Sequence, residues 1–137
     1  MEGNRKFCVI GYPLGHTMSP PIHLRLFKLS GDDSVEYGVR EVPPEELAQT
    51  AEELFQTMTG FNVTIPHKLG IMESLSALDE TARRYGAVNV VDCKTKTGYN
   101  TDVIGFTRAV EAIGGDLKGR VLLLGCGGAG RMMAIET

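Results

Sequence analysis

Lys68 and Asp102 are accompanied by amides and hydroxyls that could together hold a small, hydroxyl-rich anion and exchange a proton with it. The stretch GFNVTIPHK, residues 60–68, alternates apolar and polar side chains as a short strand with one apolar face does. A proline then ends the strand just before the lysine. One interpretation is an edge strand that runs into a surface turn. The other is a polar pocket floor, formed by Asn62 and Thr64, with a cation at its rim.

Further polar side chains could belong to the same site. Asn89 lies in the apolar stretch GAVNVV, where a buried amide needs partners from a neighbouring loop or from a polar ligand. Asp102 opens a predicted helix, where an acid also stabilises the helix by itself. Thr17 and Ser19, in the loop GHTMSPPIH, are either helix caps or two hydroxyls for a ligand carboxylate or hydroxyl. The histidines of this loop have no third ligand at a recognisable spacing, so no metal site is expected.

A glycine-rich turn near the end of the chain has the spacing of a dinucleotide-binding motif. In LLLGCGGAGR, Gly125, Gly127 and Gly130 fit G-x-G-x-x-G between a predicted strand and a predicted helix. Glycines let the backbone approach a diphosphate, and the free N–H groups of a helix start favour the anion. The alternative is a turn whose glycines serve close packing only. The residue that reads the ribose is expected about twenty positions later, so the choice between NADP and NAD is not readable here.

These groups must be positioned by strands that alternate with helices. Apolar or alternating runs predict strands at 6–12, 34–42, 60–66, 87–94 and 119–125. Helical periodicity and end signals predict helices at 21–31, 43–58, 67–86 with a break near Gly70, 100–115, and from the glycine-rich turn onward. This alternation favours an α/β fold with a mostly parallel sheet. Because ligands bind at the carboxyl ends of such strands, Lys68, Asn89 and Asp102 are expected to converge there, with Asp102 orienting a proton-transferring lysine.

The composition sets broad limits on the kind of protein. The 137 residues suffice for one ordinary domain, and the net charge of −3 with no basic run gives no electrostatic reason to bind nucleic acid. No apolar stretch approaches a membrane span or a signal-peptide core, so a cytoplasmic protein is the default expectation. The three cysteines are widely spaced and odd in number, which favours neither disulfides nor zinc. Cys8 and Cys126 are expected to be core residues.

Five motifs, in this order, resemble those of the shikimate dehydrogenases: GHTMSPPIH, NVTIPHK, GAVN, NTDVIGF and LLLGCGGAGR. The resemblance covers residues 6–134. Members of that family are roughly twice as long and have two α/β domains, the first for substrate and the second a Rossmann domain for NADP. The resemblance therefore implies a three-layer substrate-binding domain at 1–100, a connecting helix at 101–115 and the truncated start of an NADP-binding Rossmann domain at 116–137.

The resemblance also implies a reaction and a role for each matching residue. The reaction is the reversible, NADP-dependent reduction of 3-dehydroshikimate to shikimate in aromatic amino acid biosynthesis, with Lys68 and Asp102 as the acid–base pair. The implied substrate-binding residues are Thr17, Ser19, Asn62, Thr64 and Asn89. The implied diphosphate-binding residues are Gly125, Gly127, Gly128, Ala129, Gly130 and Arg131.

Two alternatives stay open beside this interpretation: a quinate/shikimate dehydrogenase that uses NAD, and a catalytically silent module that binds a hydroxy acid. Two departures from the family pattern bear on substrate preference, since Thr17 replaces a more usual serine and Val90 a common threonine. The 137-residue chain by itself is expected not to turn over substrate. The sequence does not indicate an oligomeric state.

Overall fold

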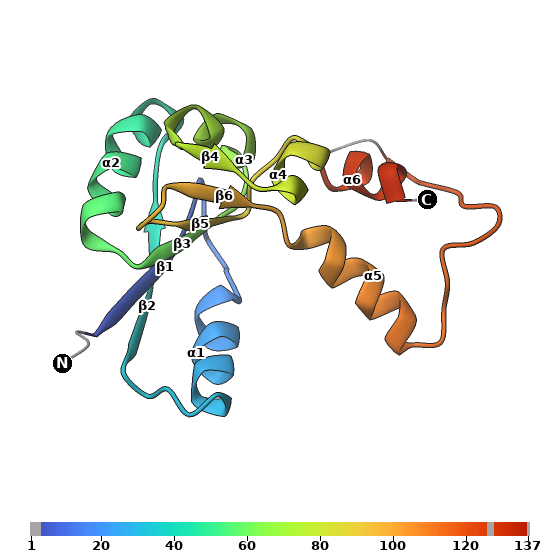
Figure 1. Cartoon of the computed structure of the whole chain (residues 1–137), viewed down its shortest axis with the longest axis horizontal. Helices are drawn as coiled ribbons and strands as arrows, with labels where there is room; N and C mark the ends of the chain where they lie inside the picture. The colour runs from blue at the N-terminus through green and yellow to red at the C-terminus, as the bar shows by residue number, and fades with distance from the viewer. Residues whose placement is uncertain (1–3, 126–127, 137) are drawn as a thin grey trace.

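The computed structural model describes residues 4–125 and 128–136. A mixed sheet of six strands, in the order β2-β1-β3-β5-β6-β4, forms its centre (Figure 1). The strands are β1 (Arg5–Gly11), β2 (Val35–Glu41), β3 (Gly60–Val63), β4 (Ala77–Leu78), β5 (Val90–Asp92) and β6 (Thr97–Tyr99). The pairs β1–β2, β1–β3 and β4–β6 are parallel, whereas β5 runs antiparallel to β3 and to β6. The predicted α/β fold with a mostly parallel sheet is confirmed.

Four helices follow the predicted periodicity with small changes at their ends. The run 67–86, which was predicted to be helical, instead also contains the strand β4, because Ala77 and Leu78 pair with Thr97 and Gly98. The helices are α1 (Ser19–Leu29), α2 (Leu47–Thr57), α3 (His67–Gly70), α4 (Glu80–Tyr85), α5 (Asp102–Ala112) and α6 (Gly128–Glu136), with 3-10 turns η1 (Pro44–Glu46) and η2 (Ile71–Ser74). The break expected near Gly70 is confirmed, because α3 ends there. Among the described residues, none of these helices is long and apolar enough to cross a membrane.

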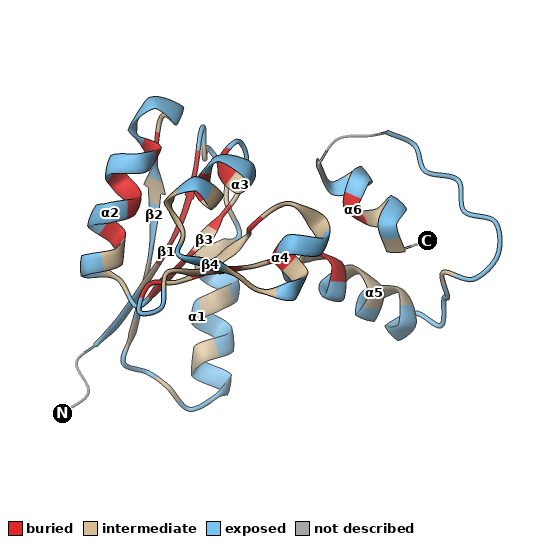
Figure 2. Ribbon diagram, turned by 45° about the horizontal axis from the view of Figure 1, so that its top comes forward, coloured by how far each residue is buried: buried red, intermediate tan, exposed pale blue. Residues whose placement is uncertain are grey.

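The main core lies between the sheet and α2. Leu47, Ala51 and Leu54 recur at helical spacing along α2 and are buried against the sheet (Figure 2). On β1, Cys8 and Ile10 belong to this core. Val9, between them, faces the opposite side of the sheet, where α1 lies. The sheet is therefore the middle of three layers, and Cys8 is a core residue as predicted.

Two predicted strands differ from the structure. The strand expected over 87–94 is shortened to β5 by the turn that leads into β6, so Asn89 immediately precedes a strand instead of lying inside one. The run 119–125 forms no strand, and its side chains from Val121 to Leu124 are between 42% and 87% exposed. The physical reason is that a strand needs a neighbour for its backbone groups, and the part of the chain that the structure describes places none beside this run. Cys126 and Gly127 lie outside the described residues.

The direction of β5 decides where the polar groups meet. Because β3 is parallel to β1 and β5 is antiparallel to β3, the start of β5 lies at the same edge of the sheet as the carboxyl end of β3. The amide of Val63 donates to the carbonyl of Asn89 (2.8 Å), and that of Thr64 donates to Ile10 (2.9 Å). The end of β3 and the residue before β5 are thus joined directly at the edge where a ligand site was predicted.

Candidate active site

A pocket of about 480 Å³ opens at this edge of the sheet. Its lining includes six of the seven predicted catalytic and substrate-binding residues, namely Ser19, Asn62, Thr64, Lys68, Asn89 and Asp102. They come from five segments of the chain: the start of α1, the end of β3, the start of α3, the residue before β5 and the start of α5. The predicted convergence of these side chains is therefore present in the structure.

The ion pair between Lys68 and Asp102 is the chemically most distinctive feature of the pocket. The Lys68 Nζ donates to Asp102 Oδ2 at 2.5 Å, and the two side chains are 26% and 31% exposed. Asp102 is the first residue of α5, where the positive end of the helix dipole stabilises a carboxylate. A partly exposed, closely paired ammonium can hold a proton toward a ligand and exchange it with water.

Asn89 fixes the second oxygen of this carboxylate. Its Oδ1 accepts from the backbone N–H of Thr101 (2.9 Å), so its Nδ2 must point the other way. That nitrogen donates to Asp102 Oδ1 (2.8 Å) and to the Thr101 hydroxyl (2.9 Å). The amide thus has the neighbouring-loop partners that one interpretation required, and through them it also orients Asp102.

Tyr37, on β2, reaches Asn62 from two strands away. Its hydroxyl donates to Asn62 Oδ1 at 2.6 Å, and its ring stacks on His23 of α1 with centroids 4.7 Å apart and planes 7° apart. Burial raises the pKa of Tyr37, which keeps this hydroxyl a donor, and burial lowers the pKa of His23. With Oδ1 occupied, the Nδ2 of Asn62 is the group that remains to donate to a ligand.

Thr17 is the predicted site residue that lies apart from the others. It lines a neighbouring hollow, also of about 480 Å³, together with Tyr12 and Ile65. Its hydroxyl accepts from the backbone N–H of Ser19 (3.2 Å), two residues along the chain. The N-cap residue of α1 is Met18, so neither Thr17 nor Ser19 is the predicted cap. Thr64 lines both hollows, so the two are adjacent.

Two described glycines of the glycine-rich stretch, Gly125 and Gly130, stand where a side chain is disfavoured. Gly125 has φ +108°, which favours glycine. A Cβ on Gly130 would lie 2.8 Å from the carbonyl oxygen of Gly125, so this position also needs glycine. Helix α6 begins at Gly128 and includes Ala129, Gly130 and the exposed Arg131. The described residues are therefore compatible with a diphosphate-binding turn.

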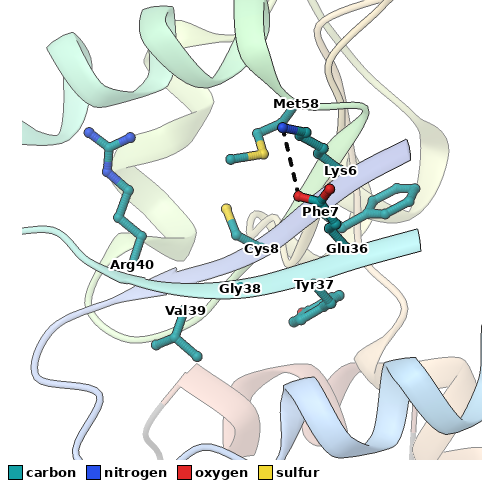
Figure 3. Close-up of a pocket in the computed structure, with 9 residues that line it drawn as sticks. All are labelled: Lys6, Phe7, Cys8, Glu36, Tyr37, Gly38, Val39, Arg40 and Met58. Atoms are coloured by element: carbon teal, nitrogen blue, oxygen red, sulfur yellow. Dashed lines mark ion pairs between the residues drawn. The ribbon is translucent and has the colours of Figure 1, made fainter. Parts of the chain in front are cut away.

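A different hollow, of about 420 Å³, lies along β1 and β2 and contains none of the predicted site residues (Figure 3). Lys6 pairs there with Glu36 at 3.7 Å, and Arg40 pairs with Glu53 at 2.8 Å. Burial raises the pKa of the Cys8 thiol to about 11, so it is neutral. Across residues 4–125 and 128–136, no group of three or more histidine, cysteine and acidic side chains could hold a metal ion. The pocket at the end of β3, which contains Lys68 and Asp102, is the candidate active site because six of the predicted residues line it.

Sequence reasoning missed Tyr37, and it considered the buried Asn100 only as a possible cap of the helix over 100–115. In the structure Asn100 accepts from the backbone N–H of Asp102. Tyr37 reaches the site only through the register that sets β2 beside β1 and β1 beside β3. The alternation of 34–42 could have placed Tyr37 on one face of a strand, but the face and the neighbours of that strand were not defined by the pattern.

Comparison with known proteins matches this chain to one family. Residues 9–91 match the model of the shikimate dehydrogenase substrate binding domain. The shikimate dehydrogenase (NADP(+)) of Bacillus cereus (strain G9842) is 46% identical over 128 residues, which are 90% of this chain and 46% of that protein. The enzyme of the same name from Shouchella clausii (strain KSM-K16) is 42% identical over 93% of this chain and 48% of its own length. The chain thus spans about half the length of these curated relatives.

Solved structures agree with the sequence match. The shikimate 5-dehydrogenase of Thermus thermophilus, in complex with NADP(H) and shikimate, is 36% identical with a TM-score of 0.89, covering 96% of this chain and 51% of that one. The Listeria monocytogenes enzyme, in complex with shikimate and NAD, is 31% identical with a TM-score of 0.87, covering 97% of this chain and 47% of that one. By its family model, its relatives and its fold, this chain belongs to the shikimate dehydrogenase family, and the part that matches is the substrate-binding domain.

Proposed function

We propose that this chain binds shikimate and 3-dehydroshikimate in the pocket at the end of β3, as the substrate-binding part of an NADP-dependent shikimate dehydrogenase. The observation that carries the proposal is the Lys68–Asp102 ion pair in a pocket lined by Asn62, Thr64 and Asn89. In this proposal, residues 1–100 are the substrate domain, 101–115 connect the domains, and 116–137 begin the NADP-binding domain.

The chemistry follows from the two oxygens of Asp102, both of which are held. Lys68 bonds to Oδ2 and Asn89 bonds to Oδ1, so hydrogen bonds to both oxygens orient the carboxylate beside the Lys68 ammonium in the pocket. As the ligand's C3 carbonyl is reduced, its oxygen takes a proton from Lys68 Nζ. The partly exposed lysine then regains a proton from water. When bound as NADPH, the cofactor would supply the hydride to the carbonyl carbon from its dihydronicotinamide ring and leave as NADP⁺.

The remaining side chains recognise the ligand by hydrogen bonds. Asn62 offers its Nδ2 because Tyr37 occupies its Oδ1. Thr64 and Ser19 each add a hydroxyl to the pocket. Ser19 provides its hydroxyl from the start of α1. Because Lys68 and Asp102 neutralise each other, we assign the ligand's carboxylate to neutral donors such as Ser19, with Thr17 next to it.

Two alternatives remain for the substrate and the cofactor. The Listeria relative was solved with NAD, and Thr17 adds a methyl group beside the proposed carboxylate position, so a quinate/shikimate enzyme that uses NAD is the second candidate. A module that binds a hydroxy acid without catalysis is the third. That candidate gives no reason for the Lys68–Asp102 pair, because binding alone does not need a proton donor.

Titration calorimetry of the chain with shikimate, and with quinate as comparator, tests the proposal. We expect shikimate to bind more tightly than quinate, and Lys68→Met to weaken shikimate binding at least tenfold. Lys94→Met removes an exposed lysine from the turn between β5 and β6 and serves as the matched control. No binding of either ligand to a folded chain, or equal effects of the two lysine variants, would overturn the proposal. Tighter binding of quinate would favour the second candidate.

A further inference from the structure

Asn100 is a buried polar residue between β6 and α5, and both polar atoms of its side chain have partners. It is 2% exposed. Its backbone N–H donates to the Thr81 hydroxyl (2.9 Å), and its Nδ2 donates to the carbonyl of Ala87 (3.0 Å). Thr81 in turn donates to Asp79 Oδ1 (2.6 Å), so the Thr81 oxygen is free to accept. These bonds hold the backbone N–H of Asn100 and one N–H of its side-chain amide.

The other contacts of Asn100 reach two elements that matter for catalysis. Its Oδ1 accepts from the backbone N–H of Asp102 at 3.1 Å, which satisfies one of the free donors at the start of α5. Its Nδ2 also donates to Met132 Sδ at 3.1 Å, and Met132, on α6, is 3% exposed. One side chain therefore contacts the backbone of the proposed catalytic carboxylate and the helix that follows the glycine-rich turn.

We infer that Asn100 is a positioning residue for Asp102, and that α6 is linked to the Lys68–Asp102 pair through Met132 and Asn100. The catalytic role of the Lys68–Asp102 pair rests on the proposed function, but the placement of Asp102 by Asn100 does not. Asn89 holds the Asp102 side chain and Asn100 holds its backbone, so the carboxylate is fixed from two directions.

A second contact holds α6 in the same place. Glu136, near the end of α6, forms an ion pair with Arg84 of α4 (2.8 Å) and accepts a hydrogen bond from the Tyr85 hydroxyl. Helix α6 thus lies against α4 at one end and against Asn100 through Met132 (Figure 1). Any displacement of α6 would remove the sulfur from a buried Asn100 N–H, which is unfavourable to leave without a partner.

Amide hydrogen exchange on the 137-residue chain tests the placement of Asp102. In Asn100→Ala the Asp102 N–H loses its acceptor, and we expect its exchange to accelerate at least tenfold while amides of the β1 core do not change. Asn100→Ser can restore a bond to the N–H two residues on, so it should recover part of the protection. Asn4→Ala is the matched control, since Asn4 is an exposed asparagine that bonds only to Glu36 among the described residues.

Shikimate affinity in a double-mutant cycle separates positioning from a general effect on the fold. Asn100→Ala should weaken binding about fivefold to tenfold. In an Asp102→Asn background it should have little further effect, because the oriented carboxylate is already gone. Additive effects, or unchanged exchange of the Asp102 amide, would overturn the positioning role. If Asn100→Ala does not fold, Asn100→Ser is measured in its place.

Met132→Leu tests the link to α6, because leucine keeps the apolar volume and removes the sulfur. We expect a twofold to threefold rise in Asp102 amide exchange, and no rise would overturn the link. Should the unaltered chain fail to bind shikimate, the proposed function fails. The exchange data on Asn100→Ala would then decide the positioning role by themselves, so the two failures are distinguishable.

Discussion

Tyr37 determines which atom of Asn62 a ligand meets. An asparagine side chain offers either an acceptor or a donor, depending on how the amide is turned. The Tyr37 hydroxyl donates to Oδ1 at 2.6 Å, and the weak contact of Nδ2 with the Asn89 carbonyl at 3.4 Å leaves that nitrogen available. Because burial raises the pKa of Tyr37, the hydroxyl keeps its proton at neutral pH and the amide keeps this orientation.

Replacing Tyr37 by phenylalanine should therefore affect binding more than folding. The ring stack with His23 survives in Tyr37→Phe, while Asn62 loses its fixed orientation. We expect shikimate affinity to fall about threefold to tenfold, with a change in the midpoint of thermal unfolding of only a few degrees. Calorimetry and circular dichroism measure the two quantities. Tyr12→Phe removes a hydroxyl outside this pocket and is the control, and an equal loss of affinity in both variants would contradict the role of Tyr37.

The residues that sequence analysis found are those whose neighbours along the chain explain them. Lys68 follows a strand end, and Asp102 opens a helix, so the local pattern is enough to place both at the ends of elements. Asn100 is different. Its type and position suggest only a possible helix cap, and its further contacts are with Thr81 and Met132, which are 19 and 32 residues away. Such partners depend on packing, which no local pattern encodes.

At the scale of elements, α4 has the clearest end signals. Asp79 caps its start by accepting from the Ala82 N–H (2.9 Å), and Gly86 ends it in the left-handed conformation, φ +62°. Partial burial acts to raise the pKa of Asp79, but hydrogen bonds from Thr81 and Ala82 outweigh it, so the pKa lies below its usual range. The folded state therefore binds the Asp79 proton more weakly than the unfolded state does.

This shift gives a pH dependence with a definite sign. A lowered carboxyl pKa contributes stability above the unfolded value, about pH 4, and this stability is lost as the pH falls through the folded value. Asp79→Ala should lower the free energy of unfolding by about 1 kcal/mol at pH 6, and the difference from the unaltered chain should shrink on acidification. Urea unfolding at several pH values measures it. Asp33→Asn, at an exposed aspartate, is the control, and a pH-independent difference for Asp79→Ala would contradict the assignment.

The antiparallel direction of β5 is an element-scale feature that the sequence did not define. Alternation predicted a strand after Gly86, and the TKTG stretch predicted a tight turn after it, but β6 was missed because it has only three residues. A reversed β5 brings Asn89 to the site from the start of a strand instead of its end. Asn89 therefore lines the pocket as predicted, but it does so because β5 is antiparallel to β3, whereas a parallel strand was expected.

At the scale of the whole molecule, the core contains two neutral thiols. Burial is the main cause that raises the pKa of Cys8 to about 11 and that of Cys93 to about 12. Both are free and buried on the α2 side of the sheet. The unfolded chain would ionise them near pH 9, so the folded state becomes less stable as the pH rises from there toward the folded values.

Alkaline unfolding should show this effect. By pH 10 each thiol should cost on the order of 1 kcal/mol of stability relative to pH 7. The variant with Cys8→Ala and Cys93→Ala should start from a lower stability because of its smaller side chains, but should lose less between pH 7 and pH 10. Guanidinium unfolding at both pH values measures the difference. An equal loss in the variant and the unaltered chain would assign the alkaline sensitivity to other groups.

The most exposed apolar run of the described chain lies between α5 and α6. Leu122 and Leu124 are 84% and 87% exposed in an extended segment without strand partners, shown in blue in Figure 2. The run VLLLG was expected to be a strand because apolar periodicity indicates burial, yet burial also needs a covering neighbour. A protease needs an extended, accessible backbone rather than a helical one. The segment around Leu122 and Leu124 is extended and accessible in this way. The exposed leucines of α1 are not, because they lie in a helix.

We expect limited digestion with chymotrypsin to cut first after Leu122 or Leu124, and to leave a resistant fragment with the sheet, α1 to α4 and α5. That fragment should still bind shikimate, because the residues that line the pocket lie between Val9 and Asp102. It should bind more weakly than the intact chain, and its Asp102 amide should exchange faster, since the Met132–Asn100 contact has been lost. Mass spectrometry locates the cut. A first cut within α1, or a fragment that binds as tightly as the intact chain with unchanged exchange, would contradict this division of the molecule.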